Sequence, residues 1–254
     1  MIKKIKNGIA KYGYFGILKK IILYPYTFYL YKKNTKFLSL KNNKDRFTEI
    51  YKSNYWDNDE SVSGPGSTIK NTEKLRSELP SLLKKFNIST ILDAPCGDFN
   101  WMKLFLRNNK LIKYTGGDIV VEIIKKNNQL YKNNAVTFVK LDITNDILPE
   151  CDLMICRDCL IHFSYNDINK FLINFNKSKI KYLLTTNFHF NKKNYQENKD
   201  ILTGDYRLIN LQTKPFNFPN PLSGIKEYDY GEMGSVHMDL YDKSQISLIK
   251  IFKK

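Results

Sequence analysis

The sequence is poor in cysteine and lacks a long apolar run, and each shortage excludes a class of protein. Only four cysteines occur among 254 residues, inside apolar, strand-like stretches. They do not have the spacing of a disulfide framework, so we expect free thiols and a reducing, cytoplasmic location. The apolar stretch at residues 21–31 contains Pro25 and is far shorter than the ~20 residues of a membrane-spanning helix. With 42% hydrophobic and 14% aromatic residues, the composition is that of a globular protein.

Acidic residues are absent from the first 44 positions, which contain eleven lysines. This arm accounts for +11 of the net charge of +16, and the other 210 residues carry +5 (16 minus 11). Lys19 and Lys20 interrupt its apolar stretch and no small-residue cleavage site follows, so a signal peptide is not predicted. A helical extension packed on the core is the favoured interpretation. Residues 1–40 would also suit an anionic membrane surface, whereas nucleic acid is the least favoured partner.

Strand-like and helix-like segments alternate from residue 89 onward. Strands are expected at residues 90–94, 113–119, 136–143, 152–157, 181–187, 236–241 and 246–252, and helices at 68–86, 99–107, 122–131 and 165–176. Pro80 predicts a kink or break in the first helix. This order predicts an α/β fold, with a doubly wound, Rossmann-like, seven-stranded and mostly parallel sheet, helices on both faces and an N-terminal helical extension.

Acidic residues end four consecutive predicted strands. Asp93, Asp118, Asp142 and Asp158 stand at or just beyond the last apolar position of each strand. In doubly wound sheets, ligands bind at the carboxyl ends of the strands. Asp118 follows Asp93 by 25 positions, near the ~20 expected for an acid that binds a ribose. The four acids therefore predict a nucleotide-like ligand at this edge.

Several motifs give the chain a resemblance to a known family. These are Tyr55-Trp56, residues 61–67, Leu92 to Met102 (LDAPCGDFNWM), residues 157–164, 183–188, 203–207 and 215–221. Residues 89–187 resemble the class I S-adenosylmethionine (AdoMet) methyltransferases, and most of residues 45–222 looks like one bacterial subgroup of that class. The subgroup is associated with capsule and other surface polysaccharides. The resemblance implies AdoMet as the cofactor and O-methylation of a sugar, or of a phosphoramidate-type decoration on one.

The resemblance implies a set of cofactor-binding residues at the strand ends. Asp118 would bind the ribose, Asp142 would contact the adenine amino group, and the turn after the first strand would approach the amino-acid end. The expected set is Ser63, Gly64, Asp93, Ala94, Pro95, Cys96, Gly97, Asp98, Trp101, Asp118, Ile119, Asp142, Ile143 and Arg157. The turn keeps only Gly97 of the three glycines usual in the class, a variant that the subgroup shares. A dinucleotide-binding fold is the alternative, disfavoured because no G-x-G-x-x-G is present.

His162 is the first candidate for the base that activates a methyl acceptor, because its ordinary pKa is near neutrality. Asp158 is the second candidate, either as the base or as the group that orients the histidine. A Leu-x-His after this strand also occurs in the class with a packing or cofactor-side role. The segment lacks the Asn/Asp-Pro-Pro-aromatic motif of enzymes that methylate planar amide or ring-amine nitrogens, which disfavours those substrates. A single Cys156-x-x-Cys159 is weak evidence for zinc, and no metal site is predicted.

The resemblance also predicts how the chain is divided. Residues 1–44 form the arm and residues 45–254 the methyltransferase domain. The domain comprises a helical lid (45–88), the core (89–187), an acceptor-recognition insert (188–235) and C-terminal strands (236–254). In the insert, Arg207 could bind a phosphate or sugar acid, and Phe216 and Phe218 could stack on a sugar or fill the core. His189 and His237 are interpreted as structural.

The function expected from the sequence is methyl transfer to an oxygen of a surface-glycan precursor. The acceptor would be a small molecule or glycan, and the arm would bring the protein near an anionic membrane. An RNA methyltransferase and a non-catalytic membrane- or nucleic-acid-associated protein remain alternatives.

Overall fold

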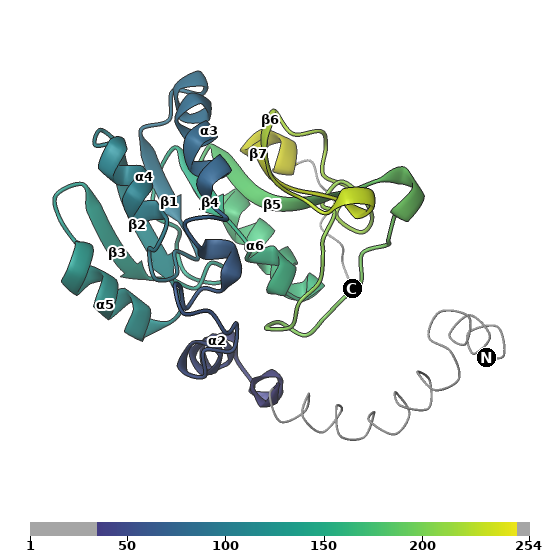
Figure 1. Ribbon diagram of the computed structural model, residues 1–254, viewed down its shortest axis with the longest axis horizontal. Coiled ribbons are helices and arrows are strands. Elements are labelled where there is room, and N and C mark those ends of the chain that lie inside the picture. Colours follow the sequence, from purple (N-terminus) through teal and green to yellow (C-terminus); the bar gives the residue numbers. More distant parts are fainter. Residues whose placement is uncertain (1–34, 248–254) are drawn as a thin grey trace. The chain divides into compact units, whose positions relative to one another are not determined.

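The computed structural model describes residues 35–247, and the predictions for the basic arm lie outside this range. The chain divides into two compact units, Met1–Leu40 and Lys41–Lys254. In the first unit the described part is a short 3-10 helix, η1 (Lys36–Ser39). The second unit contains the sheet and all the other elements (Figure 1). Within the described residues, no helix has the length and apolar character needed to cross a membrane.

The second unit is built around one seven-stranded sheet, as predicted. The strands are β1 (Thr90–Asp93), β2 (Lys113–Asp118), β3 (Val136–Lys140), β4 (Leu153–Cys156), β5 (Tyr182–Phe190), β6 (Ser223–Asp229) and β7 (Gly234–Asp242). Their order is β3-β2-β1-β4-β5-β7-β6. The first five strands are parallel, whereas β7 runs antiparallel to both β5 and β6. The chain order reverses between β1 and β4, which is where such sheets bind ligands.

Helices cover both faces of the sheet. The helices are α2 (Asn43–Lys52), α3 (Glu73–Lys85), α4 (Met102–Asn108), α5 (Val121–Tyr131), α6 (Tyr165–Lys177) and α7 (Lys243–Ser247). Apolar side chains of α3, α4 and α5 form one core with the sheet, and those of α6, α7 and residues 209–218 form the other. All four residues of β4 are buried, as expected of a central parallel strand.

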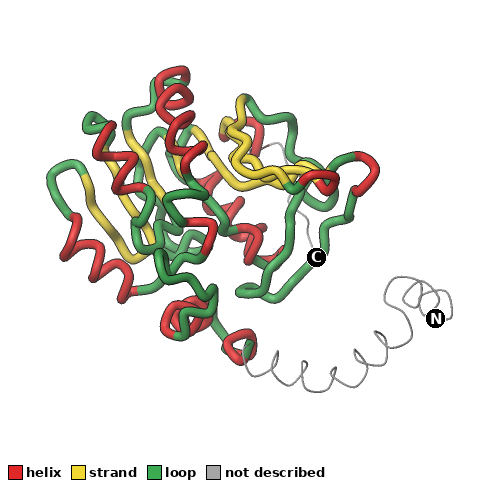
Figure 2. The backbone as a smooth tube through the Cα atoms, viewed as in Figure 1, coloured by secondary structure: helices red, strands yellow, loops and turns green. Residues whose placement is uncertain are grey.

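Three elements differ from the sequence prediction. Helix α3 begins at Glu73 and continues through Pro80; burial of its four leucines accounts for a helix that a proline would otherwise disfavour. The expected strand at residues 246–252 is wrong at its start, since Ile246 belongs to α7, and its remainder lies outside the described residues. Strand β6 was not predicted and supplies the outer edge. Figure 2 shows the segment between β5 and β6 mainly as loop.

Candidate active site

The turn after β1 lies against the end of β2. The Cys96 amide donates to the Gly117 carbonyl at 2.8 Å, and the Gly97 amide donates to Asp118 Oδ2 at 3.1 Å. Gly97 has a φ of +52°, and a Cβ there would come within 2.0 Å of Ser63 Oγ. Both the backbone conformation and the close approach require glycine. This single glycine lets residues 61–67 close over the turn.

Two buried acids face each other across the ends of β1 and β2. Asp93 Oδ2 accepts a hydrogen bond from the Tyr114 hydroxyl at 2.8 Å. Asp118 accepts from the Gly97 amide and, through Oδ1, from the Val120 amide at 2.9 Å. Burial raises the pKa of Asp93 to about 7 and that of Asp118 to about 6. Carboxylates buried at this cost are expected where a ligand supplies further partners.

The end of β3 supplies a third acid. Asp142 follows the strand and accepts from the Thr144 amide and hydroxyl through Oδ1, at 2.9 and 2.6 Å. Its Oδ2 accepts from Asn145 Nδ2 at 3.0 Å. These bonds fix the carboxylate at the edge of the sheet, beside the apolar side chains of Ile119 and Ile143.

A cavity opens at the carboxyl ends of β1, β2, β3 and β4. Apolar and polar side chains line it together, as is typical of ligand-binding cavities. The predicted site residues that line it are Ser63, Asp93, Pro95, Cys96, Gly97, Trp101, Asp118, Ile119, Asp142, Ile143, Arg157, Asp158 and His162. Acids from three neighbouring strands and the turn after β1 therefore meet in one cavity.

Three residues of the expected cofactor set stand behind the cavity wall. Ala94 is fully buried under the turn. Asp98 Oδ1 accepts from the Ser61 hydroxyl at 2.8 Å and its Oδ2 accepts from the Val62 amide at 3.1 Å. Gly64 has a φ of +88° and packs on Trp56. In this structure they shape the turn and the 61–67 loop and do not face the cavity.

Arg157 connects three separate segments of the chain at the cavity. Its Nε donates to Glu227 Oε1 at 3.0 Å, and its Nη1 pairs with Asp158 Oδ2 at 3.1 Å. Its Nη2 donates to the Gly66 carbonyl and to the Tyr228 hydroxyl, both at 2.9 Å. The side chain of Glu227 is 0% exposed, and burial raises its pKa to about 7 although Arg157 opposes this. The arginine thus links β4 to β6 and to the loop that covers the turn.

Asp158 occupies a strained position beyond β4. Its φ is +49°, which is costly for a residue other than glycine and is typical of functional sites. Thr186 holds it on both sides: the Asp158 amide donates to Thr186 Oγ1 at 2.7 Å, and the threonine hydroxyl contacts Asp158 Oδ1 at 3.1 Å. A Cβ at Gly66 would approach Asp158 Oδ2 to 2.8 Å. The ion pair with Arg157 and the bonds to Thr186 therefore fix this side chain at the cavity wall.

His162 reaches the same cavity from a 3-10 helix, η3 (Leu160–His162). Its Nδ1 lies 2.8 Å from the Asp205 carbonyl oxygen, which can only accept, so Nδ1 carries the proton and Nε2 keeps its lone pair. Burial lowers the pKa of the imidazole. The ring packs between Trp56 and Tyr206, at centroid distances of 5.5 and 5.8 Å. The Asp205 carbonyl, and not Asp158, orients the histidine.

The residues predicted to bind the acceptor lie elsewhere. Arg207 is buried, and its Nη1 donates to the carbonyls of Leu160 and Ile161 at 3.2 and 3.1 Å. Phe216 and Phe218 are buried in the core formed with α6, against Tyr165 and Tyr241 respectively. The two phenylalanines therefore fill the core, and Arg207 supports the backbone that leads to His162. None of the three lines the cavity.

The sequence analysis missed part of the cavity wall. Asn43, Phe47 and Tyr51 of α2 line the cavity together with Trp56. Glu227 and Tyr228 were missed because they lie in the unpredicted strand β6. Helix α2 carries a recognisable start signal, since the side chain of Asn42 accepts from the Asp45 amide at 2.8 Å. Nothing in its sequence shows which face borders a cavity.

No protein-family model and no curated protein matches the chain, whereas solved structures match its fold. The methyltransferase domain of bacterial CtHen1 has a TM-score of 0.51 and 13% identity, over 68% of this chain and 99% of that domain. Magnesium protoporphyrin IX methyltransferase from Synechocystis PCC 6803, crystallised with bound SAM, has a TM-score of 0.51 and 14% identity, over 80% of this chain and 98% of that one. The N-methyltransferase NodS from Bradyrhizobium japonicum WM9 has a TM-score of 0.50 and 10% identity, over 68% and 96%. The chain thus has the Rossmann-like fold of SAM-dependent methyltransferases.

Proposed function

We propose that the chain is an AdoMet-dependent methyltransferase. The observation that carries the proposal is the meeting of Asp93, Asp118 and Asp142 with the turn after β1 in one cavity. Asp118 can accept hydrogen bonds from both ribose hydroxyls, since each carboxylate oxygen keeps a free lone-pair site beside its backbone bond. Asp142 would face the adenine amino group, with Ile119 and Ile143 against the ring. The fold neighbours crystallised with SAM or SAH are consistent with this assignment.

Two glycines at the end of β2 allow close packing next to the cavity. A Cβ at Gly116 would come within 2.6 Å of Phe138, and one at Gly117 within 2.7 Å of Leu141. These glycines let β2 pack tightly against the neighbouring side chains. Asp118, the next residue, therefore lies beside the turn that follows β1. When bound, AdoMet would supply an electrophilic methyl group on a sulfonium. The four acids at the cavity would complement that positive charge.

His162 is proposed as the base on the acceptor side. Its Nε2 would take the proton of the acceptor hydroxyl as the oxygen forms its bond to the methyl carbon. The Nδ1–H bond to the Asp205 carbonyl holds the tautomer that this step needs. A lowered pKa keeps the imidazole neutral near pH 7. A positioned base contributes about 10²- to 10⁴-fold to such a reaction.

The proposed acceptor is a hydroxyl of a surface-polysaccharide precursor, or a phosphoramidate-type decoration on one. Phe47, Tyr51 and Trp56 line the cavity, and aromatic faces suit the apolar faces of sugar rings. The eleven lysines in the first 44 residues support a peripheral contact of residues 1–40 with an anionic membrane, where such precursors would be presented. This contact is part of the proposal.

A methyl-transfer screen tests the proposal. The full chain would be incubated with AdoMet carrying a radiolabelled methyl group and with nucleotide-linked sugars, capsule fragments or RNA. We expect label in a sugar fraction. Label in RNA alone would contradict the glycan assignment, and label in no acceptor class together with no AdoMet binding would contradict the enzyme assignment. A His162→Gln variant is the matched control.

A further inference from the structure

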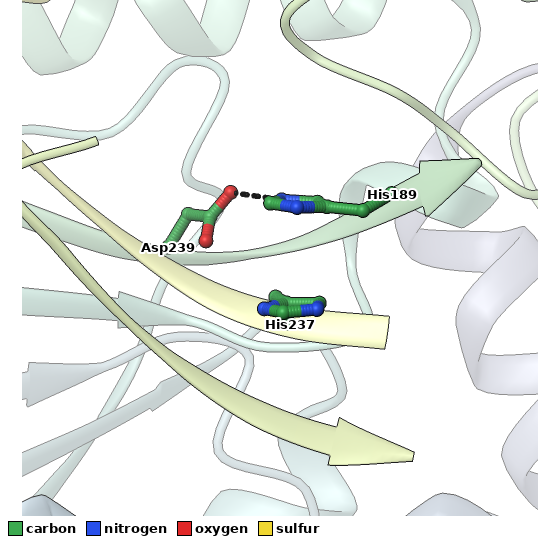
Figure 3. A group of neighbouring side chains, drawn as sticks. All are labelled: His189, His237 and Asp239. Atoms are coloured by element: carbon green, nitrogen blue, oxygen red, sulfur yellow. Dashed lines mark hydrogen bonds and ion pairs between the residues drawn. The ribbon is translucent and has the colours of Figure 1, made fainter. Parts of the chain in front are cut away.

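Two of the three histidines of the chain meet on neighbouring strands outside the active-site cavity. Strands β5 and β7 pair antiparallel, with Asn187 opposite His237 and His189 opposite Ser235. Since side chains alternate along a strand, His189, His237 and Asp239 share one face. Figure 3 shows the two imidazoles stacked with the carboxylate beside them. The ring centroids are 4.0 Å apart and the rings are nearly parallel, at 7°.

Asp239 is the buried member of this histidine–aspartate cluster, and its oxygens are unequally satisfied. Oδ2 lies 2.7 Å from His189 Nε2 and accepts from Asn187 Nδ2 at 2.8 Å. Oδ1 is buried and has no hydrogen-bond partner among the described residues. The neighbouring position on β6 is Gly224, where a Cβ would come within 2.8 Å of that oxygen. A carboxyl group this deeply buried, with one oxygen that has no hydrogen-bond partner among the described residues, calls for a cation or a further donor.

We propose that His189, His237 and Asp239 form a binding site for a divalent transition-metal ion of the Zn²⁺ class. One ligand atom from each residue lies within 4.8 Å of the others. In a tetrahedral zinc site with bonds of about 2.0–2.1 Å, ligand atoms are roughly 3.3 Å apart. Side-chain rotations that turn the two imidazoles out of their stack would bring the three groups to bonding distance, with no change in strand pairing. Two imidazoles and one carboxylate are a donor set that binds zinc or iron and leaves a coordination position open.

The residues around the histidine–aspartate cluster suit coordination of a metal ion better than a simple ion pair. His237 and His189 present their imidazoles side by side, with ring centroids 4.0 Å apart, and Asp239 lies against His189. Ser235 Oγ lies 2.8 Å from His237 Nε2, and Asn187 orients the carboxylate, as second-layer groups do at metal sites. Lys226, the nearest cation on β6, is paired with Asp229. The side chain of His189 is 33% exposed, which gives an ion a route in.

Zn²⁺ itself is the probe for this site. Full-length protein without a histidine tag would be stripped with a chelator and titrated with Zn²⁺ in a calorimeter. We expect one equivalent to bind, and His189→Ala, His237→Ala and Asp239→Asn each to weaken the affinity at least about tenfold. His162→Ala, which removes the remaining histidine, should bind as wild type does. Circular dichroism checks that each variant is folded, and His189→Ala, at a partly exposed position, serves if Asp239→Asn does not fold.

Substitution with Co²⁺ identifies the ligands. The proposal predicts d–d absorption without the thiolate-to-cobalt charge-transfer band that Cys156 and Cys159 would produce. A thiolate band, unaltered binding in the His189 and Asp239 variants, or no stoichiometric binding by wild type would overturn the proposal. AdoMet binding is read separately, so failure of the metal site and failure of the proposed function are distinguishable.

Discussion

The two sides of the active-site cavity are built in different ways. On the side proposed for the cofactor, Asp93 and Asp118 end β1 and β2, and Asp142 lies two residues beyond β3. Backbone amides of Gly97 and Val120 donate to Asp118, and that of Thr144 donates to Asp142. On the acceptor side, the wall comes from distant parts of the chain. Arg157 bonds to Glu227 across 70 positions and to the Gly66 carbonyl across 91.

Because of this difference, we expect the two sides of the cavity to tolerate amino-acid substitutions differently. The cofactor side repeats one arrangement, an acid at or just beyond the end of each strand, and the partners of these acids lie at most 21 positions away along the chain. The acceptor side depends on one buried ion pair and on the strained residue Asp158, so a single substitution there should disturb several segments at once. Changes in acceptor preference would then arise in α2, the 61–67 loop and β6 while the sheet stays the same.

The largest expected effect is on catalysis, with cofactor binding left intact. His162→Gln should lower kcat by about 10²- to 10⁴-fold, because it removes the base, while the Kd for AdoMet stays within threefold of wild type. Because burial lowers the pKa of His162, the acid limb of the wild-type pH profile should lie below pH ~6.5, the ordinary value for histidine. Stopped assays with labelled AdoMet measure kcat and its pH profile. A kcat within threefold of wild type would remove His162 from the mechanism.

Loss of the buried arginine should be the largest effect on stability. Arg157→Met leaves the charge of Glu227 buried without a partner, which costs about 3–5 kcal/mol of unfolding free energy. The double variant Arg157→Met/Glu227→Met should recover most of that loss without recovering activity. Urea denaturation measures the unfolding free energy of the wild type, the single variant and the double variant. Lys179→Met, which breaks an exposed ion pair, is the control and should leave stability unchanged. If Arg157→Met behaved like this control, the acceptor wall would not depend on the ion pair.

A smaller effect is expected at Asp118, the acid proposed to bind the ribose. Asp118→Asn keeps the shape but replaces one acceptor oxygen with a donor that faces a backbone N–H. Hydrogen bonds to charged groups contribute about 1.5–3 kcal/mol, so the Kd for AdoMet should rise about 10- to 100-fold. Asp229→Asn, on an exposed residue of β6, is the matched control. Equal affinities in the two variants would move the ribose site away from β2.

The smallest effect, measured per pH unit, is that of Asp93 on the free energy of unfolding. The pKa of Asp93 is raised to about 7 in the folded state, so between pH ~4 and ~7 the folded protein holds a proton that the unfolded chain has released. The stabilisation that this proton gives the folded state is complete below pH ~4. It falls by at most about 1.4 kcal/mol per pH unit as the pH rises, and it is lost once the pH has passed through 7. Asp93→Asn should remove this loss, so its stability advantage over wild type should grow from pH 5 to pH 8 in urea denaturation. A pH-independent difference would contradict the burial of an acid at this site.

The sheet and its acids could be predicted because both are local patterns. Apolar strands bounded by turns alternate with amphipathic helices between residues 89 and 187, and each acid stands next to the strand that positions it. Gly97 could be singled out for the same reason. These features depend on neighbours a few residues away, which a sequence displays directly.

The acceptor wall could not be predicted, since it depends on how an irregular segment folds back. Phe216 and Arg207 have residue types that suit a binding site, and only the packing of residues 209–218 on α6 shows that they are buried. Strand β6 has no clear alternation of apolar residues and exists because β7 pairs with it, which also places Glu227 near Arg157. His189 and His237 lie 48 positions apart and meet only through the register of β5 and β7.

Calorimetric titration of the full chain with AdoMet tests the central claim most directly. The account predicts a single binding site in wild type, with affinity reduced in Asp118→Asn and retained in His162→Gln. No heat of binding at millimolar AdoMet, with the protein shown to be folded, would contradict it.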